Sequence, residues 1–449
     1  MKKTTLKDFK KLMSQKDYKG AGKEALEKLT IYKAKEIYGD VLEKRILDRI
    51  INEAEELSKY CDVDTILKVV EVILYRKEIG ELRLSRLSYN NSLLFYLLGI
   101  GNVNPLPKHT YCPKCHMFYW GNKNNELCEC CGEKMVEDGY DLPFEPLLDE
   151  IRKSGLNFSF SSTRNSKHVT VPIRYFESSL IKLAKELGFT QEDLDDSKIN
   201  KTDLDNVINC LSVVRFNGGL SYYTKHYKHI SICEHQPFIG IDDLSHPVLR
   251  TMLHLWEDVY HEENLFKVVN MLHGTGVYDG NMDFVANAYR GNPLSLKNCI
   301  TSRDELYQFL IKSQLSNDDA LLICRETRLC GKGHLSLLSV AKLREAGVEE
   351  KYISFMRHIS YIFHKGHTVA HTRLAIKLAK IYLEEPLRYY KAYFTLNKEK
   401  LLKMDKNYDF VKGLSESKST DMEEIYLACI DLVERGHDPK TLITEVLNS

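Results

Sequence analysis

Four cysteines in the first third of the chain have the spacing of a metal site. They form two Cys-x-x-Cys pairs separated by twelve residues, Cys112 with Cys115 and Cys128 with Cys131. Zn²⁺ prefers four soft ligands in a tetrahedron, and each pair can direct two thiolates at one point. Gly132, directly after the second pair, suits the tight turn that such a pair needs. A four-thiolate site leaves no open coordination position, so we predict a structural zinc; the alternative is four free thiols.

The segments around this site are expected to be mainly helical. Between residues 41 and 57, apolar side chains recur every three or four positions with charged residues between them, which predicts an amphipathic helix. A further helix is expected at 179–187, and helices again from residue 261 onward. Short strand-like runs at 156–160 and 238–241 interrupt this pattern. The predicted fold class is therefore α+β, mainly helical.

The overall composition excludes several classes of protein. The chain has 449 residues, of which 43% are hydrophobic and 28% charged, which is ordinary for a globular protein of several domains and unlike a disordered, collagenous or coiled-coil chain. Lys+Arg and Asp+Glu number 63 each, so the net charge does not favour a general polyanion binder. The start of the chain lacks the apolar run of a signal peptide, and no stretch is long and apolar enough for a membrane span. We predict a cytoplasmic protein with reduced cysteines and no membrane partner.

Motifs on both sides of the cysteines resemble the zinc-binding region of PolC-type bacterial replicative DNA polymerases. They are NVNPLP at 102–107, YCPKC at 111–115 and DGYDLPFE at 138–145. Further resemblances lie in the same order as in that family. One precedes these motifs, at 34–40, and the others come after them, at 273–281, 331–333, 361–367 and 386–394. The family's exonuclease and histidinol-phosphatase-like modules have no counterpart here, so we expect a shortened relative.

The resemblance implies a polymerase palm–fingers-like module with an inserted four-cysteine zinc knuckle. It predicts four parts of the chain. These are an N-terminal helical region that starts the palm- or thumb-like module (1–107), a zinc-binding insert (108–145), a palm-like core (146–260) and a helical fingers-like domain (261–449).

The positions that this family uses for catalysis differ in this chain. The family holds two Mg²⁺ ions with three aspartates for nucleotidyl transfer. The first two belong to an Asp-x-Asp strand, but residues 151–176 here contain no Asp or Glu, although the family-like run 156–159 is present. The third position is Gly240, with Asp242 two residues further on. One carboxylate could not hold two metal ions, so we predict a degenerate module without catalytic residues, which needs Mg²⁺ only if polymerase activity is retained.

The family's phosphate-binding motifs are also altered. Its glycine-rich loop matches residues 84–92, which keep Arg86 but contain no glycine. Without glycine, the backbone cannot approach a phosphate closely. The resemblance would still assign residual nucleotide binding to Arg86, Lys332, Lys365 and His367. The alternative is that Lys332 is an exposed charge in a turn, Lys365 a solvated lysine at a helix start and His367 a structural histidine.

Basic residues are concentrated in two stretches. Besides the acid-free residues 151–176, residues 357–395 contain seven Lys or Arg against two acids. A basic surface of this kind would bind the DNA backbone with salt-dependent affinity. We assign DNA contacts to five residues, with solvated charged faces as the alternative. They are Arg152, Lys153, Arg373, Lys377 and Lys380.

Three functions are consistent with these patterns. The first is a degenerate PolC-like module that binds primer–template DNA, single-stranded DNA or a replication protein. The second is an active DNA-directed DNA polymerase, whose metal ligands come from shifted residues such as Asp242 or from a partner chain. The third is a protein-binding module alone. Primer extension separates the first two, and salt-dependent DNA binding separates the first and third.

Overall fold

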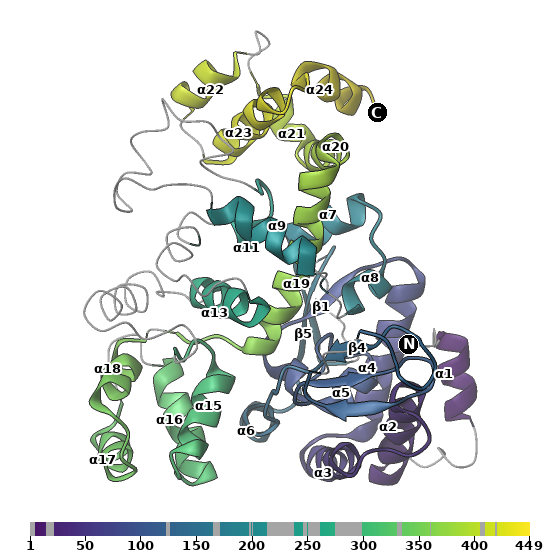
Figure 1. The fold of residues 1–449 in the computed structure, drawn as a ribbon, viewed down its shortest axis with the longest axis vertical. Coiled ribbons are helices and arrows are strands. Elements are labelled where there is room, and N and C mark those ends of the chain that lie inside the picture. The colour runs from purple at the N-terminus through teal and green to yellow at the C-terminus, as the bar shows by residue number, and fades with distance from the viewer. Residues whose placement is uncertain are drawn as a thin grey trace.

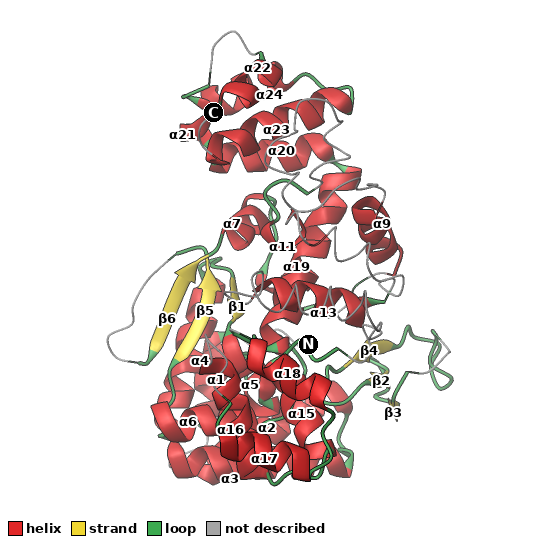
Figure 2. Cartoon of the chain, turned by 90° about the vertical axis from the view of Figure 1, so that its left-hand side faces the viewer, coloured by secondary structure: helices red, strands yellow, loops and turns green. Residues whose placement is uncertain are grey.

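A computed structural model gives the fold. It describes residues 5–14, 22–122, 126–164, 171–196, 199, 201–212, 238–245, 249, 261–273, 299–329, 335–359, 361–404, 409–417 and 420–449. Within these residues the chain is mainly helical and contains two three-stranded sheets (Figures 1 and 2). The predicted α+β class is confirmed, whereas the four domain boundaries stay predictions. None of the described helices combines the length and the hydrophobicity that a bilayer crossing requires.

The first helices form a bundle beside the cysteine-bearing segment. They are α1 (Leu6–Met13), α2 (Lys23–Tyr38), α3 (Lys44–Tyr60), α4 (Val63–Glu78), the 3-10 helix η2 (Leu87–Asn91), α5 (Leu93–Leu97) and α6 (Glu145–Ser154). Helix α3 begins three residues later than the periodicity predicts, and Val41 is 90% exposed. Glu53 of α3 is fully buried and accepts hydrogen bonds from the amides of Leu93 and Leu94. Since these amides have no partner within α5, the buried carboxylate fixes where α5 starts.

The first sheet packs against this bundle. It consists of β1 (Arg83–Ser85), β5 (Phe158–Ser162) and β6 (Ile173–Glu177), in the order β1-β5-β6. β1 and β5 are antiparallel, whereas β5 and β6 are parallel (Figure 2). All five residues of β5 are buried, and the strand lies two residues beyond the predicted position. The central strand of this sheet is therefore covered on both faces.

The four predicted metal ligands lie in the connections of the second sheet. It consists of β2 (His109–Tyr111), β3 (Phe118–Trp120) and β4 (Val136–Asp138), with β2 in the middle and both pairings antiparallel. The three-residue strands leave this sheet little core of its own, so it depends on its attachment to the bundle and on the cysteine cluster.

The rest of the described chain is helical. It contains α7 (Ser179–Glu186), α8 (Gln191–Asp195), α9 (Lys201–Ser212), α11 (Asp242–Ser245), α13 (Glu262–His273), α15 (Arg303–Lys312), α16 (Asn317–Leu329), α17 (Leu337–Glu345), α18 (Glu350–His358), α19 (Lys365–Glu384), α20 (Pro386–Leu396), α21 (Lys398–Leu401), α22 (Phe410–Glu416), α23 (Thr420–Glu434) and α24 (Pro439–Asn448). The long helix α19 runs through the middle of the molecule, with α20–α24 at one end (Figure 1). It contacts η2, α7, α9, α13 and α20, so it joins the two halves of the fold.

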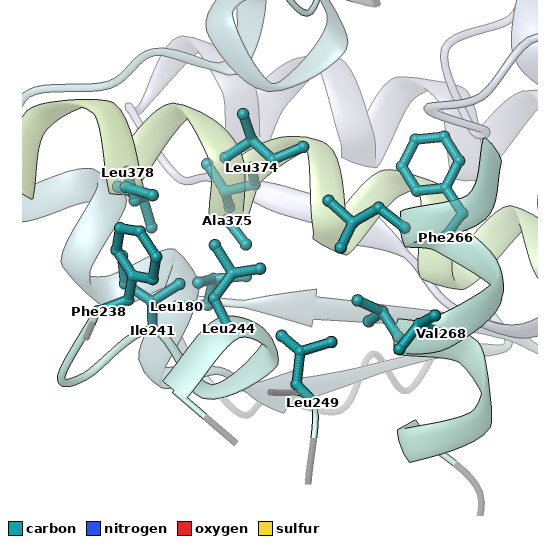
Figure 3. Packing of buried hydrophobic residues seen from close by; sticks show 14 of the residues in the cluster. Leu180, Phe238, Ile241, Leu244, Leu249, Phe266, Val268, Leu374, Ala375 and Leu378 are labelled. Atoms are coloured by element: carbon teal, nitrogen blue, oxygen red, sulfur yellow. The ribbon is translucent and has the colours of Figure 1, made fainter. Parts of the chain in front are cut away.

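The predicted strand at 238–241 is wrong. These residues form a turn in which the Ile241 amide donates to the Phe238 carbonyl over 2.9 Å, and α11 follows. Phe238 and Ile241 are fully buried against Leu378 and its neighbours on α19 (Figure 3). The apolar run therefore anchors a turn in the core, which the hydrophobic pattern alone cannot distinguish from a strand. The predicted helix at 179–187 is confirmed as α7.

Candidate functional site

The four predicted metal ligands lie together. Their Sγ atoms are all within 4.8 Å of one another, with 3.4 Å between Cys112 and Cys131 and 3.4 Å between Cys115 and Cys128. A tetrahedral zinc with bonds of about 2.3 Å would separate neighbouring sulfurs by about 3.8 Å. The cluster could therefore hold a metal ion such as zinc. In the described ranges, no second group of three or more His, Cys, Asp or Glu side chains has such a geometry.

Both cysteine pairs use the same backbone turn. The residue after each second cysteine has a left-handed backbone, with φ of +61° at His116 and +70° at Gly132. The amides of Cys112 and Cys128 donate to backbone carbonyls of the returning chain, each over 2.8 Å. Burial alone would raise the pKa of the Cys112 thiol, but hydrogen bonds from the amides of Cys115 and Lys114 lower it to about 6. At Cys112 the turn thus favours the thiolate, which is the form that binds a metal. The pKa values of Cys115 and Cys131 are raised in spite of backbone hydrogen bonds from Met117 and Glu133, because burial and the neighbouring thiols favour their neutral forms.

His116 anchors the cluster to the bundle, and sequence reasoning missed it. Its Nδ1 lies 2.9 Å from the carbonyl oxygen of Ile37 at the end of α2. Gly39 follows with φ of +90°, and a Cβ there would lie 2.8 Å from the Cβ of His116. The only signal in the sequence is that histidine takes the position where the second pair has glycine. A non-glycine residue with a left-handed backbone is uncommon, which indicates that the side chain of His116 makes a contact that stabilises this turn.

A buried polar cluster holds the base of the insert. Asn104 donates through Nδ2 to Tyr38 Oη and to Asp138 Oδ2, both over 2.8 Å. Tyr96 also donates to Asp138, over 3.3 Å. Burial, together with the Asp138 charge, raises the pKa of Tyr38, so it stays a neutral hydroxyl. The sheet that carries the cysteines is therefore bonded to α2 and α5 rather than hinged on a loop.

The first sheet lacks the Asp-x-Asp pair that the family resemblance would place on it. β5 carries Phe and Ser only. Gly240, which the resemblance matches to the third aspartate, has φ of +83°, and a Cβ there would lie 2.5 Å from Cε2 of Tyr393. Asp242 starts α11 and accepts a hydrogen bond from Ser179 Oγ.

Of the four residues assigned to nucleotide binding, the structure describes three. Each of these three contacts a different set of neighbours. The Arg86 guanidinium lies over the ring of Phe176, 4.6 Å from its centroid, and burial lowers its pKa. Lys365 Nζ lies 3.3 Å from the Glu263 carboxylate, and its side chain is 14% exposed. His367 is buried on α19, 4.1 Å from the ring centroid of His371 and 4.8 Å from that of Phe363.

Lys332 lies outside the described residues. His367 packs among aromatic rings, as the structural alternative expects. Lys365 is the first residue of α19, but it is not the solvated lysine of that alternative, because its side chain is 14% exposed and pairs with Glu263. The assignment of these residues to nucleotide binding stays a prediction.

The two basic residues of α6 form ion pairs. Arg152 pairs with Glu56 over 2.9 Å, and Lys153 pairs with Asp149 over 3.1 Å. Both basic side chains are partly exposed. Exposed pairs of this kind are weak, so a DNA phosphate could still compete for these cations.

The three basic residues of α19 are also occupied. Arg373 is 1% exposed and donates to the carbonyl of Asn102 over 2.8 Å, so it does not lie on a surface. Lys377 Nζ donates to two backbone carbonyls at α8, over 2.6 and 2.9 Å. Lys380 pairs with Asp203 over 3.1 Å. The basic stretch of the sequence is thus largely matched by acceptors from distant segments.

Comparison with known proteins confirms the resemblance. No protein-family model matches the chain. It is 24% identical to the DNA polymerase III PolC-type of Staphylococcus saprophyticus subsp. saprophyticus over 95% of its residues, and 24% identical to that of Staphylococcus haemolyticus over 95%. Identity to the DNA polymerase III PolC-type of Thermotoga petrophila is 24% over 83% of the chain. The chain spans only 35–36% of the length of these relatives. It is therefore similar in sequence to PolC-type DNA polymerases along most of its length.

Proposed function

We propose that this chain is a PolC-like palm–fingers module that does not extend primers and acts by binding DNA or a replication protein. The observation that carries this proposal is the packing at Gly240. Its left-handed backbone and the Tyr393 ring at its side-chain position leave no room for a carboxylate. Tyr389 donates to the Ile239 carbonyl over 2.5 Å and holds the same turn in place. A metal-binding aspartate at this position would require the turn to refold.

The composition of the palm-like sheet supports the same proposal. Two divalent ions need several carboxylate oxygens to replace part of their hydration. β5 offers the neutral hydroxyls of Ser159, Ser161 and Ser162, all of them buried. On β6, Glu177 ends the strand and accepts a hydrogen bond from Lys182 over 3.0 Å. Serine hydroxyls would not balance the charge of two magnesium ions.

Primer extension tests the loss of catalysis. The purified chain is incubated with primer–template DNA, all four dNTPs and Mg²⁺, and in parallel with Mn²⁺. We expect no incorporation above that of a heat-denatured sample. Asp242→Ala is the matched control, because Asp242 is the carboxylate closest in sequence to the missing ligand. Incorporation that Asp242→Ala abolishes would establish the active polymerase instead.

One exposed feature of the sheet suits DNA. Phe176 on β6 is 40% exposed, with the Arg86 guanidinium over its ring and Arg174 exposed on the same strand. An aromatic ring with basic neighbours can stack on an unpaired base while the cations contact phosphate. The second candidate, a protein-binding module alone, is favoured by the internal pairing of the basic residues of α19.

Binding measurements separate these two candidates. Fluorescence anisotropy with single-stranded and primer–template DNA is recorded at several salt concentrations. A DNA-binding module should lose affinity steeply as salt rises, and Phe176→Ala should weaken single-strand binding several-fold. Tyr75→Ala is the control, because Tyr75 is a 54% exposed aromatic residue on α4. No binding to either DNA at low salt would leave the protein-binding module as the function.

A further inference from the structure

A cavity of about 380 Å³ lies between the helical bundle, the second sheet and α8. Small-molecule sites typically have volumes of about 300–1,000 Å³ and mainly apolar walls. Helix α2 contributes Leu29, Lys33 and Ile37, which follow one another at four-residue steps and so lie on one face of the helix. Helix α4 lines the cavity with a similar stripe that includes Val70 and Leu74. None of the described residues assigned to nucleotide binding lines it.

The two lysines on the walls of this cavity are paired with acids. Lys77 of α4 forms an ion pair with Glu192 of α8 over 2.9 Å, and Lys33 forms one with Glu36 over 2.9 Å. Only 26% of the Lys77 side chain and 12% of the Lys33 side chain are exposed, so their aliphatic stems extend the apolar wall. An anionic ligand would have to displace an acid to pair with either lysine.

The remaining charges at the cavity are balanced as well. Asp196 at the end of α8 lies 3.8 Å from Lys377 of α19. Asp195 accepts a hydrogen bond from Asn102 Nδ2 over 2.5 Å. Burial lowers the pKa of Arg83, and the charge of Asp195 opposes this effect, so these two lining residues compensate each other. The described lining therefore offers neither a cation nor an anion without a counter-charge.

One polar group of the lining remains for a ligand. Tyr111 lines the cavity, and no hydrogen bond joins its hydroxyl to another group in the part of the chain that the structure describes. Its ring meets the Tyr38 ring edge-on, with 5.5 Å between the centroids, and lies 6.1 Å from the His109 ring. Tyr96, the other tyrosine of the lining, donates to Asp138 over 3.3 Å. A hydroxyl on a ring that is held in place can orient an apolar ligand.

We propose that this cavity binds a neutral, mainly apolar small molecule with a hydrogen-bond acceptor for the Tyr111 hydroxyl. The apolar stripes of α2 and α4 supply the hydrophobic contact. A charged ligand is disfavoured, because it would lose its hydration without gaining a free counter-charge. The ligand would contact the bundle, α8 and the second sheet together, so its binding stabilises the folded state. This proposal goes beyond the proposed function, because it requires neither catalysis nor DNA.

Fluorescence titration with the neutral dye prodan tests the proposal. Prodan has a naphthalene body with one ketone acceptor, and its emission shifts to shorter wavelength in apolar surroundings. We expect saturable binding of one dye per chain and a Tm that rises with dye concentration. The anionic dye anilinonaphthalene sulfonate has a similar body and should bind roughly tenfold more weakly or worse. Absence of saturable prodan binding, or tighter binding of the anionic dye, would overturn the proposal.

Two variants test whether the dye occupies this cavity. Leu74→Trp adds bulk to the α4 wall and should abolish prodan binding. Tyr75→Trp is the matched control, because Tyr75 is the next residue of the same helix, is 54% exposed and does not line the cavity. Its prodan affinity should equal that of the wild type. Retained binding in Leu74→Trp, or an equal loss in both variants, would reject the cavity as the site.

Tyr111→Phe tests the hydrogen bond and keeps the ring. It should weaken prodan binding about two- to tenfold, as the loss of one hydrogen bond predicts. It should leave the weaker binding of anilinonaphthalene sulfonate unchanged. An unchanged prodan affinity would overturn the assigned ligand class. If Leu74→Trp does not fold, Tyr111→Phe decides alone, since weaker prodan binding supports the site and unchanged binding rejects it.

Discussion

The cysteine insert and the basic stretch 357–395 look alike in the sequence, because each concentrates one chemical type in a short segment. In the structure they behave in opposite ways. Four of the five thiols between residues 112 and 131 converge on one another. The basic side chains of 357–395 instead find acceptors far along the chain, as with Lys380 and Asp203 or Lys391 and Glu445.

The difference lies in where the partners come from. Metal ligands of a knuckle are partners of each other, so their local spacing contains nearly the whole site. A lysine can pair with any acid that the fold brings close, and the stretch by itself does not reveal that acid. The residues of a short segment therefore predict a metal site better than they predict whether a basic segment forms a charged surface.

The largest effect is expected from removing the metal. Cys112→Ser should abolish zinc binding and unfold the insert, because metal binding to such knuckles is worth roughly 10–16 kcal/mol. Bound zinc per chain and near-ultraviolet circular dichroism measure the loss. Cys130→Ser is the control, since Cys130 is exposed and not among the four converging thiols. A Cys112→Ser protein with a full zinc content would show that the spacing of the cysteines does not identify the metal ligands.

The next largest effect concerns the buried member of the basic stretch. Arg373→Ala should cost roughly 3–5 kcal/mol of unfolding free energy, because it leaves partner groups around Asn102 and Tyr140 without their buried cation. Urea unfolding measures this cost. The salt dependence of DNA binding should not change. If Arg373→Ala left the stability unchanged but weakened DNA binding, Arg373 would be a DNA-contacting residue and not a structural one.

An intermediate effect is expected at Glu305 of α15, which pairs with Lys267 over 3.3 Å and accepts from the Thr301 amide over 2.8 Å. Burial would raise its pKa, but Lys267, Lys365 and the Thr301 hydrogen bonds lower it below the usual 4.5. Its contribution to stability is therefore complete above pH 4.5 and is lost as the pH falls through the lowered pKa.

Glu305→Gln should reduce stability at pH 7 by about 1.5–3 kcal/mol and have less effect in acid. Urea unfolding at pH 7 and below pH 4 gives the comparison. An equal loss at both pH values would mean that Glu305 acts through packing and not through its charge.

The smallest effects belong to the exposed pairs. Lys380→Ala and Lys391→Ala should each cost about 0.2–1 kcal/mol, since both side chains are substantially exposed. Their DNA affinity should equal that of the wild type. If either variant reduced the slope of log DNA affinity against log salt concentration by about one, that lysine would contact a phosphate, and residues 357–395 would form a DNA-binding surface.

Several elements were predictable because their signals are local. Helix α7 was predicted at 179–187 and ends one residue earlier, at Glu186. The run 238–241 misled the prediction because burial of Phe238 and Ile241 serves a turn, and only the packing on α19 reveals this. His116 was missed because its partner, the Ile37 carbonyl, lies 79 residues away.

Patterns along the chain were enough to establish the mainly helical class, the four converging cysteines, the PolC relationship and the absence of acids from 151–176. Each of these features depends on residues that are close in the sequence, or on the order of motifs along the chain. Three features emerged only from the packing: a tyrosine ring fills the side-chain position of Gly240, acids neutralise much of the basic stretch, and Glu150 accepts hydrogen bonds from Ser88 and Arg303. Nearly all of these contacts join groups more than 50 residues apart, whose meeting is set by how the helices pack.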